Sequence, residues 1–179
     1  MLPTPAISLV IASCVALLAV VTDLHARRIP NWLTGGGLLL GLAGNVLLSS
    51  ISDGVSGTIA AGLYAVTGAA LGFGMLFPFY LIRVHGMGRA IGAGDVKLLA
   101  ALGAIAGPHA VVSIMVYAAL AGAVQSIVIL AKQGHVTFML QQTMVLGVAP
   151  SLSGRKAPYA VAIAAGVLLS MFLPPVVRF

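Results

Sequence analysis

Six long apolar stretches dominate this chain and restrict what it can fold into. They fall at about 5–22, 33–50, 58–82, 95–107, 110–131 and 158–177. A transmembrane helix requires about 20 mostly apolar residues. Only 7% of the chain is charged, against roughly 25% in a soluble domain. The sequence therefore predicts an all-α, polytopic integral membrane protein, folded as a single domain over residues 1–179.

The number of spans depends on the apolar run from Leu98 to Ala131, which is too long for one helix and short for two. The tripeptide Gly-Pro-His at 107–109 interrupts this run, and proline ends or kinks a helix. We therefore expect two helices here, the first of them short, and about six transmembrane helices in total. A further apolar segment at 136–150 is broken by polar residues and either lies on the membrane surface or re-enters the protein.

The distribution of positive charge supports six spans. No Lys or Arg precedes Arg27, so residues 1–22 lack the basic start of a signal peptide and are expected to be a retained first span. With the N- and C-termini outside, every basic residue except Arg178 lies in or beside a cytoplasmic loop, which satisfies the positive-inside rule. A single span over 98–131 would instead place Lys132 and the basic loop after it outside. Membrane orientation thus explains the net charge of +6, and no nucleic-acid binding is expected.

Acidic residues are scarcer than basic ones. The chain contains Asp23, Asp53 and Asp95 and no Glu. Asp23 ends the first span and Asp95 begins the fourth, so the topology brings both to the cytoplasmic face at about the same depth. Asp53 falls on the opposite face and is followed by glycine, which is ordinary turn chemistry.

Two carboxylates at one membrane boundary admit two interpretations. In an aspartyl protease, a close pair shares one proton, and one member activates water while the other donates to the peptide carbonyl. Alternatively, each Asp caps a helix or pairs with a nearby cation. Gly92 and Gly94 shift the balance toward the protease, because glycine lets a substrate backbone approach closely. By itself, however, a Gly-x-Gly-Asp segment is equally compatible with a loop-to-helix hinge. The lone cysteine and the histidine spacing predict neither a metal site nor a cofactor.

The segments "GAGDVK" at 92–97, "DLHARRIPN" at 23–31 and "RKAPYAVAIAAG" at 155–166 resemble three motifs of one family. This family is the type IV prepilin peptidases, polytopic aspartyl proteases of the G-x-G-D class. "GAGDVK" at 92–97 matches the family's G-x-G-D-x-K signature. "DLHARRIPN" at 23–31 resembles its first aspartate followed by a basic segment and Ile-Pro-Asn. "RKAPYAVAIAAG" at 155–166 resembles its Lys-x-Pro-Tyr-Gly-x-Ala-Ile segment, although Ala160 stands where glycine is usual. The resemblance covers nearly the whole chain in order and spacing.

This resemblance implies catalysis by Asp23 and Asp95, with Gly92 and Gly94 shaping the approach to them. Lys97 would either lower a carboxylate pKa or hold a substrate group. The implied partner is a pilin-like precursor with a basic leader and an apolar helix, cut at the cytoplasmic boundary of the bacterial inner membrane, in contact with lipid.

Chain length places this protein with the family's short form. Larger members carry an extra segment with paired cysteines, and many of them N-methylate the cleaved pilin. This chain has one cysteine and a short first loop, so it is similar to the form that accompanies tight-adherence (Flp-type) pili. Methylation and an S-adenosylmethionine site are not expected.

Other residues receive structural interpretations. Asn31 is expected to cap the second span, and Trp32 and Tyr159 to be interfacial aromatics. The main alternative function is a small membrane transporter with an Asp-based proton relay. Carriers often contain internal repeats and midplane polar residues, and neither is apparent here. A non-catalytic membrane scaffold is the third possibility.

Overall fold

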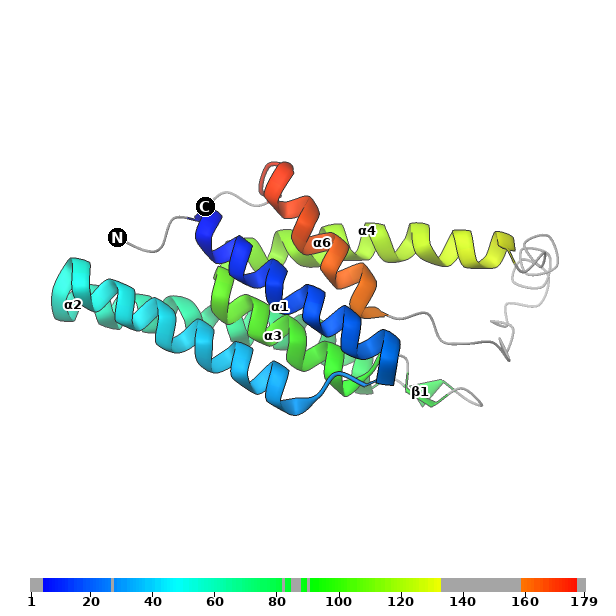
Figure 1. Cartoon of the computed structure of the whole chain (residues 1–179), viewed down its shortest axis with the longest axis horizontal. Helices are drawn as coiled ribbons and strands as arrows, with labels where there is room; N and C mark the ends of the chain where they lie inside the picture. The colour runs from blue at the N-terminus through cyan, green and yellow to red at the C-terminus, as the bar shows by residue number, and fades with distance from the viewer. Residues whose placement is uncertain are drawn as a thin grey trace.

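The computed structural model describes residues 5–26, 28–81, 83–84, 88–89, 91–132 and 159–176. These residues form five helices and one short antiparallel hairpin (Figure 1). The elements are α1 (Pro5–Ala26), α2 (Asn31–Leu81), β1 (Arg83–Val84), β2 (Gly88–Arg89), α3 (Ala93–Ala106), α4 (Pro108–Lys132) and α6 (Tyr159–Phe172). The expected all-α class is confirmed, and the segment at 136–150 lies outside the described residues.

Four of the described segments are long and apolar enough to cross a membrane. They are Ile7–Ala26, Asn31–Ile51, Val55–Leu81 and Pro108–Ile129. Large apolar side chains such as Ile51, Val55 and Phe172 are at least four-fifths exposed, which is costly in water and favourable in lipid. The protein is therefore an integral membrane protein.

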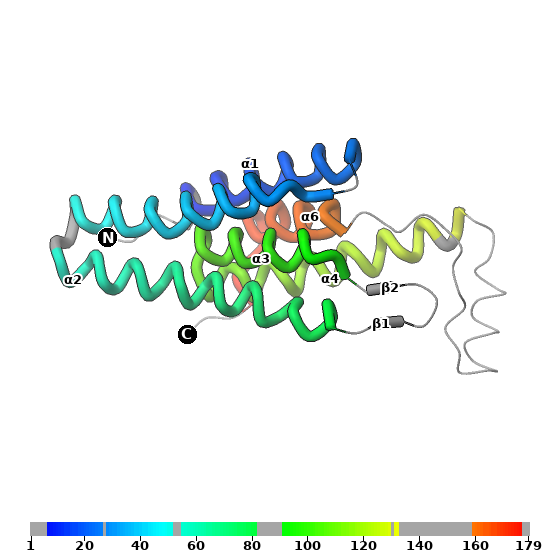
Figure 2. The backbone as a smooth tube through the Cα atoms, turned by 90° about the horizontal axis from the view of Figure 1, so that it is seen from below, coloured from blue at the N-terminus to red at the C-terminus, as the bar shows by residue number. Residues whose placement is uncertain are grey.

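Two of these four segments belong to α2 and form a pair of antiparallel arms. The chain runs out along Asn31–Ile51 and returns along Val55–Leu81, so the start and end of α2 lie on the same side of the molecule (Figure 2). Val46 of the first arm lies beside Gly62 of the second. The expected second and third spans correspond to these arms. The side chain of Asp53 is not among those that the structure describes.

Helix α3 is short and lies at the centre of the bundle. Nine of its 14 residues are buried, from Val96 to Ala106, because α1, α4 and both arms of α2 pack around it. A helix that is apolar on every side belongs in such a position. The expected break at Gly-Pro-His is confirmed: α3 ends at Ala106, Gly107 adopts a φ of 85°, and α4 begins at Pro108.

Glycines let the backbones of α2 and α3 touch. A Cβ atom on Gly41 would lie 2.7 Å from the Ala104 carbonyl carbon, and one on Gly68 would meet the backbone of Gly103. A Cβ atom on Gly72 would meet the Leu99 backbone in the same way. Small residues at helix interfaces are the usual route to close packing in membranes.

The buried end of α3 has its carbonyl groups satisfied by side chains. The Asn45 amide nitrogen donates to the carbonyl oxygens of Ala104 and Gly41, at 3.0 and 2.8 Å. The Tyr64 hydroxyl donates to the Ala106 carbonyl at 3.3 Å. The last carbonyls of a helix have no partner within the helix and are costly to bury unpaired. These contacts therefore fix α3 at a definite height in the bundle.

Several helix ends gather on one side of the bundle. The end of α1 and the starts of α2, α3 and α6 lie toward this side, whereas the start of α1 and the end of α6 lie toward the opposite side (Figure 1). Helix α6 packs against α4 and α1, and the Ser13 hydroxyl of α1 donates to the Met171 sulfur at 3.3 Å. This arrangement brings distant parts of the sequence to one polar region.

Candidate active site

A polar pocket of about 310 Å³ opens where these helix ends meet. It is lined by Asp23, Arg28, Ile29, Asn31, Gly92, Ala93, Gly94, Asp95 and Lys97. Of the Asp, Glu, Lys and Arg side chains that the structure describes, all line this pocket except Lys132. All five residues proposed from the sequence are therefore in one pocket.

Asp95 is held in the first turn of α3 by a local hydrogen bond. Gly92 is the N-cap residue, with extended backbone and no side chain to cap the helix. The Asp95 carboxylate accepts a hydrogen bond from the Gly92 backbone N–H. This is one half of a capping box, in which an acid at the third helical position satisfies the N-cap amide. The capping interpretation of Asp95 is thus correct, and it also fixes where the carboxylate points.

Asp23 has no comparable structural role. It lies in the last turn of α1, near the negative end of the helix dipole, where an acid is unfavourable by about 0.3–1 kcal/mol. Among the described residues, no Lys or Arg forms an ion pair with Asp23 or Asp95. Helix capping and ion pairing therefore do not explain Asp23, and residues placed against local preference are often functional.

The two carboxylates interact electrostatically. Both are half-buried, and both line the same pocket. Asp95 lies outside the four membrane-crossing segments. Burial, and then the neighbouring Asp23 carboxylate, raise the pKa of Asp95 to about 6, although the hydrogen bond from Gly92 acts in the opposite direction. Two neighbouring carboxylates resist being ionised together, and this is the condition under which they share one proton.

The two glycines of the motif leave space at this point. A Cβ atom on Gly92 would lie 3.0 Å from the Asp95 Oδ2 atom. A Cβ atom on Gly94 would lie 3.1 Å from the Cβ atom of Ile29, in the connection between α1 and α2. Gly92 thus leaves room for the carboxylate, and Gly94 lets the connection approach α3.

Lys97 is bonded across the pocket to α2. Its ammonium donates to the Asn31 Oδ1 atom at 2.9 Å. The expectation that Asn31 caps α2 is wrong: α2 begins at Asn31, and the Pro30 carbonyl accepts the first helical bonds, from the amides of Leu33 and Thr34. Asn31 is therefore the first residue inside the helix, and its side-chain oxygen serves Lys97.

Tyr159 lies closer to the carboxylates than its interpretation as an interfacial aromatic suggested. It is the first residue of α6, half-buried, and packs against the core. Its phenol interacts electrostatically with Asp95. A signal was present in the sequence, because Tyr159 lies in one of the three motifs. Spacing alone could not show that α6 starts beside α3.

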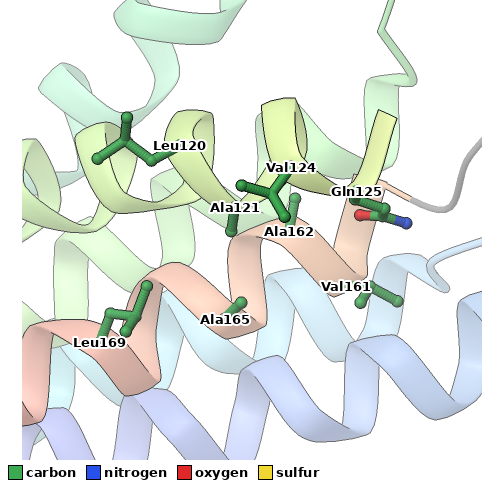
Figure 3. Close-up of a pocket in the computed structure, with 8 residues that line it drawn as sticks. All are labelled: Leu120, Ala121, Val124, Gln125, Val161, Ala162, Ala165 and Leu169. Atoms are coloured by element: carbon green, nitrogen blue, oxygen red, sulfur yellow. The ribbon is translucent and has the colours of Figure 1, made fainter. Parts of the chain in front are cut away.

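Other candidate groups lie away from the pocket. His25 and Cys14 are exposed on α1, and the described His, Cys and Asp residues form no cluster suited to a metal ion. A groove of about 390 Å³ runs between α4 and α6, lined by apolar residues and Gln125 (Figure 3). It contains no ionisable side chain and lacks groups for hydrolysis.

The fold and the pocket define a helical membrane protein in which two carboxylates, at the ends of two helices, line one pocket. The model of the type IV leader peptidase family matches residues 10–127, and this chain belongs to that family. This match contains both Asp23 and Asp95.

One relative is 34% identical over 122 residues, a "Prepilin leader peptidase/N-methyltransferase" from Pectobacterium carotovorum subsp. carotovorum. The match covers 68% of this chain and 40% of the relative. The chain thus spans less than half the length of that protein. No solved structure matches the chain.

Proposed function

We propose that this protein is an aspartic endopeptidase that removes the leader peptide from a pilin-like precursor, with Asp23 and Asp95 as its catalytic pair. The meeting of these two carboxylates in one polar pocket carries the proposal. Family membership supports it, as does the name of the related protein.

In the proposed mechanism, the pair holds one proton. The ionised carboxylate accepts a proton from water, and the water oxygen bonds to the carbon of the scissile peptide. The other carboxyl donates its proton to the carbonyl oxygen as charge develops there. The C–N bond then breaks: one carboxyl of the pair gives a proton to the amine nitrogen, and a hydroxyl of the tetrahedral intermediate returns a proton to the pair as its carbonyl re-forms. Gly92 and Gly94 keep the approach to the carboxylates clear.

We also propose a membrane placement, which the gathering of helix ends and the distribution of basic residues support. We place the pocket at the cytoplasmic face of a bacterial inner membrane, with both termini outside. In this topology α3 and α6 are the fourth and sixth membrane crossings, shorter than the others, and residues 1–179 form a single domain. The apolar part of α3 begins at Leu98, so Asp95 lies at the boundary. A basic leader joined to an apolar helix would present its scissile bond at this height.

The proposal is limited to cleavage. The relative's name includes an N-methyltransferase, but we assign no methylation to this chain, which lacks the paired cysteines of the larger forms. We assign it to the short form associated with tight-adherence pili.

Co-expression with a pilin-like precursor tests the proposed function. We expect the wild-type protein to shorten the precursor on a gel, and Asp23→Asn and Asp95→Asn each to leave it intact. Either loss should reduce cleavage by at least about 10³-fold, as for the loss of a central catalytic group. Asp53→Asn is the control and should cleave normally. Efficient cleavage by either variant of the pair would remove that residue from the mechanism.

A further inference from the structure

The hydrogen bond between Lys97 and Asn31 raises the question of why a cation beside two carboxylates is bonded to a neutral amide. The Lys97 Nζ atom lies 2.9 Å from the Asn31 Oδ1 atom, and both residues line the pocket with Asp23 and Asp95. In the described part of the chain, the Lys97 ammonium is hydrogen-bonded to Asn31 and forms no ion pair with either carboxylate.

Helical geometry gives Lys97 two possible positions. Residues two apart on a helix do not face each other, so Lys97 starts on a different side of α3 from Asp95. Its ammonium is on a flexible four-carbon stem with three donors. Released from Asn31, the ammonium can turn toward the carboxylates that line the same pocket. An opposite charge within about 4–6 Å favours the ionised form of an acid. An ammonium beside Asp23 and Asp95 would therefore lower the pKa of the pair, and the pair would lose the shared proton that hydrolysis needs.

We propose that Asn31 is a positioning residue, which holds the Lys97 ammonium on the α2 side of the pocket and thereby lets the Asp23–Asp95 pair retain its shared proton. This inference rests on the proposed function. It assigns the Ile-Pro-Asn segment a role in the site: Pro30 caps α2, so that the Asn31 side chain is left to bind Lys97.

The charged and titratable groups around Asp95 come from several elements. Asp23 lies on α1, Arg28 in the connection to α2, and Lys97 on α3 itself. Tyr159 of α6 interacts with Asp95 electrostatically. Among the described side chains, Arg28 and Lys97 are the cations that line the pocket, and Lys97 is the one with a hydrogen-bonded anchor.

The pH dependence of precursor cleavage tests this inference. Asn31→Leu keeps a similar volume and removes the acceptor. We expect the alkaline limb of its rate profile to move to lower pH by about one unit, in line with an opposite charge beside a carboxylate. Asn31→Leu combined with Lys97→Met should return the limb to its wild-type position, because no ammonium remains to be released. Asn31→Gln retains an amide oxygen and should keep the limb near the wild-type position.

Two controls separate the possible outcomes. Ser50→Leu introduces a leucine at an exposed position on the first arm of α2, the arm that begins with Asn31. This variant should leave the pH profile of cleavage unchanged. A merely structural Asn31 would lower the rate at every pH without moving the limb, and that result would overturn the inference. Cleavage that survives Asp95→Asn would instead contradict the proposed function.

Discussion

At the scale of single residues, Asp95 has an energetic cost as well as a proposed role. Its pKa is raised to about 6 by burial and by Asp23, while an unfolded Asp titrates near 3.9. The folded state therefore binds the proton more tightly than the unfolded state. The resulting stabilisation is complete below about pH 4 and is lost as the pH rises through about 6.

We therefore predict that Asp95→Asn stabilises the folded protein above pH 7. An amide cannot ionise, and its oxygen can still accept the Gly92 hydrogen bond. The free energy of unfolding should rise by about 1–2 kcal/mol at pH 8, somewhat less than a full two-unit shift of pKa would give at 1.36 kcal/mol per unit. Thermal unfolding in detergent at pH 8 and pH 4 measures this. A variant less stable than wild type at pH 8 would contradict the prediction.

Gly92 gives a second prediction at this scale. Its φ of −73° and ψ of 146° suit any residue, so Gly92→Ala adds no backbone strain. The new methyl would meet the Asp95 Oδ2 atom at 3.0 Å and displace the carboxylate. A displacement of about 1 Å can reduce catalysis by about 10²-fold, so we expect cleavage to fall by 10- to 100-fold with thermal stability little changed. Gly36→Ala, whose methyl has nothing within 4 Å, is the control for the cleavage assay.

At the scale of elements, the contact between α2 and α3 determines where Asp95 stands. Helix α3 has no room to move along α2, because backbones touch at Gly41, Gly68 and Gly72 and Asn45 bonds to the end of the helix. The position of the first turn of α3 is thus set by contacts near its other end.

A pair of glycines on the returning arm of α2 tests this contact. A methyl on Gly72 would lie 2.8 Å from the Leu99 carbonyl carbon, whereas one on Gly74 would have nothing within 4 Å. Gly72→Ala should therefore destabilise the protein by about 1–3 kcal/mol, the usual cost of overpacking. Gly74→Ala should be neutral or slightly stabilising, because alanine favours a helix. Equal melting temperatures for the two variants would show that the helices separate at no cost.

At the scale of the whole molecule, the proposed topology places Gly54 and Gly134 on opposite sides of the membrane. Gly54 lies between the two arms of α2, and Gly134 follows α4. Reporter fusions that are active only outside the membrane should therefore be active at Gly54 and inactive at Gly134. Activity at both positions would contradict six crossings and the cytoplasmic placement of the pocket.

Much of this organisation could be read from the order of residues. Apolar runs define the helices, because every backbone polar group in lipid must be bonded within its own segment. Proline and glycine at 107–108 divide α3 from α4 for local steric reasons. The motifs at 23–31 and 92–97 identified Asp23, Asp95, Gly92, Gly94 and Lys97, and all five line one pocket.

What could not be read from the order of residues depends on how the helices pack. Three features depend on contact between segments far apart in the chain. They are the hydrogen bond between Lys97 and Asn31, the approach of Tyr159 to Asp95, and the burial of Asp95. Apolar periodicity shows that a helix is buried without naming its neighbours. The neighbours here are selected by backbone contact at glycines and by Asn45 at the end of α3, and these depend on shape in three dimensions.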